Sequence, residues 1–223
     1  MRFDCSDLTP KDAYALLISA IVPRPIAWVT TVDPDDRVNL APFSFFTGIC
    51  SRPPLLALSI GQRRWNGKWQ AKDTLANIQA TGELVVHIAP ATMANAVNAS
   101  AAELPPGESE VGANGLHTEP SVYVRPPRLV GCPVAMECKL SQIVWLGHGN
   151  AQALVVAEVL SFAVDDAVWN ADAGQIDAAK LDPLSRLGGQ CFGTLGQSVA
   201  LPRPDWLATG FEARVAVQPR RDS

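Results

Sequence analysis

Residues 24–46 read RPIAWVTTVDPDDRVNLAPFSFF, and this stretch decides the fold class. Its first part, 26–32, is rich in the β-branched and aromatic residues that favour strands. Residues 33–36 combine the Asp and Pro residues that preset turn geometry. Residues 38–46 form a second extended run. The stretch therefore predicts a β-hairpin with a longer loop.

The same signals recur along the rest of the chain. Further strands are expected at 55–60, 84–89, 122–124, 134–145, 152–164 and 192–195. Helices are expected at 10–19, after a Thr9 cap and Pro10, at 75–80, ending at Gly82, and at 91–102. Residues 104–121 are expected to form a surface loop, and 181–189 a loop with a short helical turn.

Strands and helices do not alternate regularly in this pattern, which disfavours a doubly wound parallel sheet. It favours a mainly β protein, an antiparallel barrel with peripheral helices. We expect one domain over 1–200 and a loosely attached tail over 201–223.

Composition narrows the function. The 223 residues include 18 Lys+Arg and 22 Asp+Glu, a net charge of −4 at pH 7. A nucleic-acid binder would need a basic stripe, so that class is disfavoured. Hydrophobic residues make up 48%, which argues against disorder. Charged residues make up only 18%, below the usual quarter, which predicts extra buried surface at a subunit interface or an apolar ligand site.

The five cysteines are odd in number and contain no C-x-x-C pair, and the chain has only three histidines. This pattern disfavours a zinc or iron–sulfur site, so we expect no metal, and reduced thiols in a cytoplasmic protein. No apolar run approaches the ~18 residues of a membrane span, so no membrane association is expected. The G-x-G-x-x-G, G-x-S-x-G and P-loop motifs are also absent.

The best candidate for an anion site is Lys72-Asp73-Thr74, at the start of a predicted helix. A helix N-terminus offers unpaired N–H groups and a partial positive charge. Lys72 adds a cation and Thr74 a hydroxyl donor, while Asp73 is expected to cap the helix. Alone, the triplet is a weak signal, and it fits an ordinary capped helix with a solvated lysine better.

Other polar side chains lie at predicted strand ends. These residues are Thr30, Thr31, Asn39 and Ser44. They could bind a ribityl chain, a phosphate or the polar edge of a ring, or they could serve only as turn caps and strand formers. A flat aromatic ligand would bury well against the aromatic residues of this third of the chain, most of which should still be core. They are Trp28, Phe43, Phe45, Phe46, Trp65 and Trp69.

Two histidines and one glutamate complete the candidates. His148 lies between two glycines and could contact a cofactor or simply form a polar loop tip. His87 lies within a predicted strand and is expected in the core. Glu158 stands in an apolar run, where a buried carboxylate needs a partner, and we expect Arg24 or Arg186 to supply it.

Taken together in order and spacing, several segments resemble the flavin reductase-like, FMN-binding split-barrel proteins of the flavoredoxin group. The resemblance covers roughly residues 10–196, and departs from the family pattern at 109–116 and at Cys191-Phe192, where a tyrosine pair is often found. We expect these departures to affect substrate choice more than FMN binding. The matching segments are 24–31, 38–46, 52–55, 72–78, 82–83, 102–107, 134–140 and 186–189.

The resemblance implies a six-stranded Greek-key split barrel that binds FMN, as a homodimer with flavin near the interface. Thr30 and Thr31 would contact the phosphate or ribityl end, and Ser59 would end a strand beside the flavin. Three further residues, Lys72, Asp73 and Thr74, would grip the phosphate. The ring would be lined by Asn39, Ala41, Pro42, Phe43, Ser44 and Phe45.

The implied activity is that of an NAD(P)H:FMN oxidoreductase, a flavin reductase that passes electrons to oxygen, free flavin or a partner monooxygenase. The flavin carries the chemistry, so no catalytic side chain is expected, and His148 is a candidate nicotinamide contact. Two alternatives stay open: an FMN electron-transfer protein with a non-nicotinamide donor, and a non-catalytic flavin-binding module.

Overall fold

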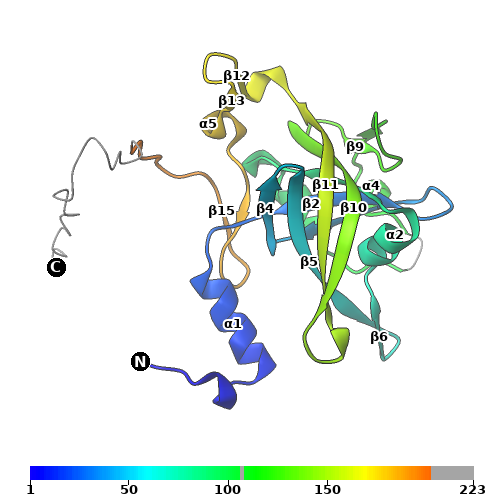
Figure 1. Cartoon of the computed structure of the whole chain (residues 1–223), viewed down its shortest axis with the longest axis vertical. Coiled ribbons are helices and arrows are strands. Elements are labelled where there is room, and N and C mark those ends of the chain that lie inside the picture. The colour runs from blue at the N-terminus through cyan, green and yellow to red at the C-terminus, as the bar shows by residue number, and fades with distance from the viewer. Residues whose placement is uncertain (106–107, 202–223) are drawn as a thin grey trace.

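The computed structural model describes residues 1–105 and 108–201. One antiparallel sheet of eight strands forms its centre, paired in the order β3-β2-β7-β10-β11-β5-β4, with β6 on β5 (Figure 1). These strands are β2 (Ala27–Val32), β3 (Val38–Phe43), β4 (Phe46–Ser51), β5 (Pro54–Trp65), β6 (Lys68–Ala71), β7 (Glu83–His87), β10 (Val134–Leu146) and β11 (Gln152–Val164).

The two ends of the strand order, β3 and β4, are neighbours in sequence. Among the described strands they pair with β2 and β5 and not with each other, so hydrogen bonds do not close the barrel at this seam. The predicted mainly β split barrel with peripheral helices is confirmed, although the sheet has eight strands where the resemblance implied six.

Three small sheets and short helices surround the barrel. β1 (Arg24–Pro25), β14 (Ser185–Arg186) and β15 (Phe192–Gly193) pair together, as do β8 (Thr118–Glu119) with β9 (Arg128–Leu129) and β12 (Trp169–Asn170) with β13 (Gln175–Ile176). The α-helices are α1 (Pro10–Ala20), α2 (Asp73–Thr81), α3 (Ala94–Ala99), α4 (Glu110–Ala113) and α5 (Ala178–Leu181). The 3-10 turns are η1 (Cys5–Asp7), η2 (Ala91–Met93), η3 (His148–Asn150) and η4 (Asp166–Val168).

The β2–β3 hairpin forms as the sequence predicts. Asp33 Oδ1 accepts hydrogen bonds from the amides of Asp35 and Arg37, both at 2.9 Å, so one aspartate organises the whole turn. The turn sets Val32 opposite Val38. This register brings Thr31 opposite Asn39, two residues of the candidate site.

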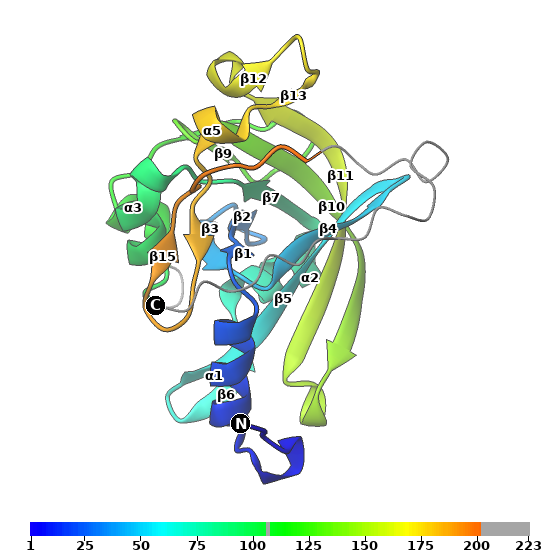
Figure 2. The same cartoon turned by 90° about the vertical axis from the view of Figure 1, so that its left-hand side faces the viewer.

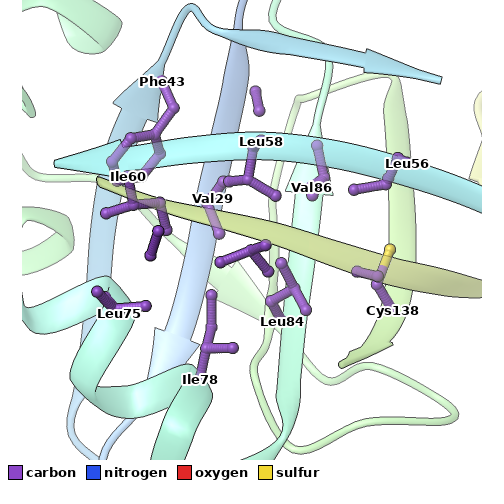
Figure 3. Close-up of a cluster of buried hydrophobic side chains, with 14 of the residues drawn as sticks. Val29, Phe43, Leu56, Leu58, Ile60, Leu75, Ile78, Leu84, Val86 and Cys138 are labelled. Carbon is purple, nitrogen blue, oxygen red and sulfur yellow. The ribbon is translucent and has the colours of Figure 1, made fainter. Parts of the chain in front are cut away.

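The main core lies between the sheet and α2 (Figure 3). Leu75 and Ile78 of α2 are buried against strand residues, which fixes the N-terminus of this helix beside β2 and β3. Gly82 ends α2 with φ 72°, a left-handed conformation that glycine adopts without strain. The strand residues of this core include Val29, Phe43, Leu56, Leu58, Ile60, Leu84, Val86 and Cys138.

A second core lies on the other side of β2. Trp28 is fully buried there, and its Nε1–H donates to Ser100 Oγ at 2.8 Å. Ile26, Leu40 and Val97 pack in the same cluster. The segment after α3 is thereby held against β2 and β3.

Several predicted segments differ in the structure. The expected helix 91–102 is a 3-10 turn followed by the six-residue α3, since Asn and Ser residues compete with helical hydrogen bonds. The expected loop 104–121 contains α4 and β8, and 181–189 contains β14. The last of these strands pairs with β1, a partner distant in sequence. The expected tail lies almost wholly outside the described residues.

The expected burial of Glu158 is wrong. Its side chain is only partly buried, and Lys139 lies opposite it on β10. Arg24 and Arg186, its expected partners, donate instead to main-chain carbonyls. Among the residues that the structure describes, the buried carboxylates are Glu110 and Glu137.

Within the described residues, no helix combines the length and the apolar character needed to cross a membrane.

Candidate functional site

A cavity of about 90 Å³ lies where the N-terminus of α2 meets β3 and the segment 100–104. Six residues singled out from the sequence line this phosphate pocket, as we call it below: Asn39, Ala41, Pro42, Lys72, Asp73 and Thr74. The fold brings them together because α2 packs its apolar face on the sheet beside β3.

A hydrogen-bond network holds the wall of the pocket. Asn39 Nδ2 donates to Thr74 Oγ1 at 2.9 Å and lies 3.3 Å from Thr31 Oγ1. Asn77 Nδ2 donates to the same Thr31 oxygen at 3.1 Å. All four side chains are buried. Thr31 therefore lies behind the pocket and fixes Asn39, while Asn39 fixes the hydroxyl of Thr74.

The start of α2 is not capped by a side chain. Lys72 occupies the N-cap position with an extended backbone, and Asp73 is the first helical residue. The expectation that Asp73 caps the helix is therefore wrong. The first-turn amides remain available to an anion, and the helix dipole adds to their attraction. Lys72 Nζ lies 5.9 Å from the centroid of the Phe43 ring.

Arg63 is a site residue that the sequence analysis missed. Its side chain lines the pocket and is 7% exposed, and one of its terminal nitrogens donates to Asp73 Oδ1 at 2.9 Å. Its Nε is buried and has no hydrogen-bond partner in the described part of the chain. Such a donor normally finds a partner, so this nitrogen is suited to a ligand oxygen. The expected strand ended at residue 60, but β5 continues for five more residues, and Arg63 lies in this polar continuation.

Glu110 closes the pocket from α4. Its side chain is 7% exposed, and its Oε2 accepts a hydrogen bond from the Leu40 amide at 2.9 Å. Burial raises the pKa of the Glu110 carboxyl. Asp73, a second carboxylate of the lining, is paired with Arg63, and the third, Glu103, is exposed. The negative charge facing a bound anion is therefore reduced at Glu110 and Asp73.

A second hollow, of about 170 Å³, adjoins the first. Both are lined by Pro42 and Ala101, so they are contiguous along β3. We call this second one the Arg186 hollow. It is lined by Ile26, Phe43, Ser44, Val97, Asn98, Arg186 and Phe192, besides the two shared residues.

A family model described as a flavin reductase like domain matches residues 19–174. The chain belongs to the flavin reductase-like family. An uncharacterized protein of Halalkalibacterium halodurans is 38% identical over 92% of this chain and 97% of its own length.

Solved structures agree with that assignment. Nitrilotriacetate monooxygenase component B from Bacillus cereus has a TM-score of 0.84 at 33% identity, covering 90% of this chain and 98% of its own. The 2-nitrobenzoate 2-nitroreductase NbaA of Pseudomonas fluorescens has a TM-score of 0.83 at 26% identity, covering 94% and 100%. The flavin reductase-like family and its split-barrel fold are therefore both shown.

Five residues expected in the flavin reductase-like site lie outside both cavities, and one of them is Thr31, behind the phosphate pocket. Thr30 points away from Thr31, as neighbours on a strand must, and its hydroxyl donates to the Pro127 carbonyl at 2.7 Å. Phe45 and Ser59 face each other across strands, where the Ser59 amide donates to the Phe45 carbonyl at 2.9 Å. His148 is exposed in the β10–β11 turn.

The aromatic residues of the first third do not form one surface. Trp28 is buried in the second core, and Phe43 in the main core with its ring at the edge of the Arg186 hollow. Trp69 is 69% exposed on the β5–β6 hairpin, where Trp65 lies under the Arg63 guanidinium. Only Phe43 of this group lines either cavity.

Proposed function

We propose that this protein is an FMN-binding oxidoreductase that uses NAD(P)H to reduce its flavin. The observation that carries the proposal is the buried, unpaired Nε of Arg63 beside Lys72 and the uncapped start of α2. A chain of the flavin reductase-like family thus has a built receptor for a phosphate monoester. Charge-assisted hydrogen bonds of this kind are the strong ones.

The dimensions of β3 suit the rest of FMN. From Asn39 to Ser44 the strand and its extension comprise six residues, and the five steps between them cover about 16 Å at the usual rise per residue. That is comparable with a ribityl phosphate joined to a tricyclic ring. The proposed ring site is therefore the segment from Ala41 to Ser44, which runs from the phosphate pocket into the wall of the Arg186 hollow.

The roles of the protein residues follow from their contacts. Lys72, Arg63 and the Thr74 hydroxyl bind the phosphate, and Asn39 holds that hydroxyl in place. Asp73 holds Arg63 in its buried position. When bound, the flavin supplies the hydride and electron chemistry, and the protein binds and orients it. His148 stays a proposed nicotinamide contact.

Two classes of electron acceptor have support beyond oxygen and free flavin. The Bacillus cereus structure is component B of a nitrilotriacetate monooxygenase, which favours delivery of electrons to a partner monooxygenase. The Pseudomonas fluorescens structure is a 2-nitrobenzoate 2-nitroreductase, which makes a small aromatic acceptor the second candidate.

We also propose a homodimer. No residue of α1 is buried, and this helix projects from the barrel in both views (Figures 1 and 2). Tyr14 and Leu17 of α1 and Ile21, the residue that follows the helix, are more than half exposed, and Ile49 on β4 is 50% exposed. Such surfaces mark interaction sites. Leu17→Glu is expected to shift sedimentation towards the monomer, whereas Lys11→Glu on the same helix is not.

A cytoplasmic location is proposed from the cysteines. All five are free thiols, and burial raises the pKa of Cys132 and Cys138 to about 12, which makes these two inert. Unpaired thiols are typical of proteins in a reducing compartment.

Anaerobic stopped-flow mixing of FMN-loaded protein with NADH, and separately with NADPH, tests the function. Loss of the oxidised-flavin absorbance with at least one donor is expected. FMN binding without reduction by either donor would reject the reductase and leave the electron-transfer or flavin-binding alternatives.

A further inference from the structure

The Arg186 hollow has an apolar base and a cationic mouth. Ile26 and Val97 are almost fully buried at its base, and Phe43 is 7% exposed. A third, wider hollow of about 560 Å³ lies over α3. Arg186 and the exposed Asn98 line both this hollow and the Arg186 hollow, so both residues lie where the two hollows meet. A ligand that fits must therefore place an apolar body inside and a polar group at the mouth.

The Arg186 guanidinium is held in place with donors to spare. It lies 4.4 Å from the centroid of the Phe192 ring, and one terminal nitrogen donates to the Gly189 carbonyl at 3.1 Å, the other to the Gln190 carbonyl at 3.4 Å. Arginine carries five N–H donors in a fixed fork. The remaining donors can bind a planar anion with two oxygens, the geometry that the guanidinium fork matches.

In the described part of the chain, no Asp or Glu pairs with the arginines at this corner of the hollow. Arg24 lies opposite Arg186 in the β1–β14 register and is 5% exposed, and its Nε lies 3.4 Å from Ser44 Oγ in the wall of the hollow. Among the described residues, neither arginine makes an ion pair with Asp or Glu. Two guanidinium charges therefore act on the hollow with only carbonyl and hydroxyl partners, which favours an anionic ligand.

We propose that the Arg186 hollow binds a small monocyclic aromatic carboxylate, with its ring against Phe43 and Val97 and its carboxylate on Arg186. The volume of about 170 Å³ suits one ring. The hollow shares Phe43 and Ser44 with the proposed ring site, so a ligand there would contact the flavin ring, which makes this ligand class the acceptor of reducing equivalents. That role rests on the proposed function, whereas binding itself does not.

Isothermal titration of the purified protein with benzoate at neutral pH tests the site, with benzamide as the uncharged ligand of the same shape. Each titration is run with and without saturating FMN. Benzoate is expected to bind about tenfold or more tightly than benzamide, because only the carboxylate makes charge-assisted bonds to Arg186.

Two variants make the test specific. Arg186→Gln removes the cation, and Asn98→Asp adds a negative charge at the same mouth on an exposed side chain. Both are expected to weaken benzoate binding about tenfold and to leave benzamide unchanged, whereas Arg64→Gln, an exposed arginine outside both hollows, changes neither.

Equal binding of benzoate and benzamide, unchanged benzoate binding in Asn98→Asp, or no benzoate binding at all would overturn the proposal. Benzoate binding to a protein that takes up no FMN would leave the site standing and reject the proposed function.

Discussion

His87 makes the stability of this protein depend on pH. The ring is fully buried between β2 and β9, with Nδ1 2.9 Å from the Trp28 carbonyl and Nε2 2.9 Å from the Leu129 amide. The amide can only donate, so Nε2 accepts and Nδ1 carries the proton of a neutral ring. Protonation of Nε2 would break the bond to Leu129 and bury a charge.

Burial accordingly lowers the pKa of His87 to about 4, below the ordinary 6.5. Between these values the unfolded chain binds the proton and the folded protein does not, so the free energy of unfolding falls as the pH falls from 6.5 towards 4. At about 1.4 kcal/mol per pKa unit, the difference between the two pKa values corresponds to a contribution of about 3 kcal/mol to the free energy of unfolding. About 2 kcal/mol of this is lost between pH 7 and pH 4.5.

Urea unfolding of wild type and His87→Gln at a series of pH values from 7 to 4.5 measures this contribution. Carboxylates titrate in both proteins, so the quantity of interest is the difference in slope. The variant is expected to be less stable at pH 7 and to lose about 2 kcal/mol less than wild type on acidification. His117→Gln, which removes an exposed histidine, should follow wild type. Equal pH dependence in wild type and His87→Gln would refute the assigned neutral, buried ring.

Two further predictions concern the phosphate pocket and the helix that forms it. Glu110→Gln keeps an acceptor for the Leu40 amide and removes a negative charge beside the proposed phosphate, so FMN affinity above neutral pH should rise about two- to fivefold, measured by quenching of flavin fluorescence. Unchanged or weaker binding would contradict that charge effect. Gly82→Ala forces a side chain into φ 72° at the end of α2 and should lower the free energy of unfolding by about 1 kcal/mol. Gly48 has open space around it and a φ outside the left-handed region, so Gly48→Ala should lower the free energy of unfolding by less. Equal losses in the two glycine variants would contradict the assigned cap.

The sequence allowed much of the fold to be predicted because its strands carry local signals. The Asp33 turn and the 13-residue β11 were predictable from residue type alone. Two-residue strands such as β1 and β14 were not, because their pairing depends on partners about 160 residues apart. Their existence follows from tertiary packing and not from propensity.

The residues of the candidate site also differ in whether a local sequence signal or a tertiary contact places them. The start of α2 is a local signal, so Lys72 and Thr74 could be found from the sequence. Arg63 could not, because its burial depends on the length of β5 and on Asp73 across the pocket. The apolar neighbours of Glu158 suggested that this carboxylate is buried. The structure buries Glu110 instead, whose carboxylate accepts a hydrogen bond from the Leu40 amide of β3.

The central claim is that Arg63 and the start of α2 bind the phosphate of FMN. The most direct measurement is a paired titration of wild type and Arg63→Gln with FMN and with riboflavin, which lacks the phosphate. Wild type is expected to bind FMN at least about tenfold more tightly than riboflavin, and Arg63→Gln is expected to remove most of that preference without changing riboflavin affinity. Equal affinities of wild type for the two flavins, or an undiminished preference in the variant, would contradict the account.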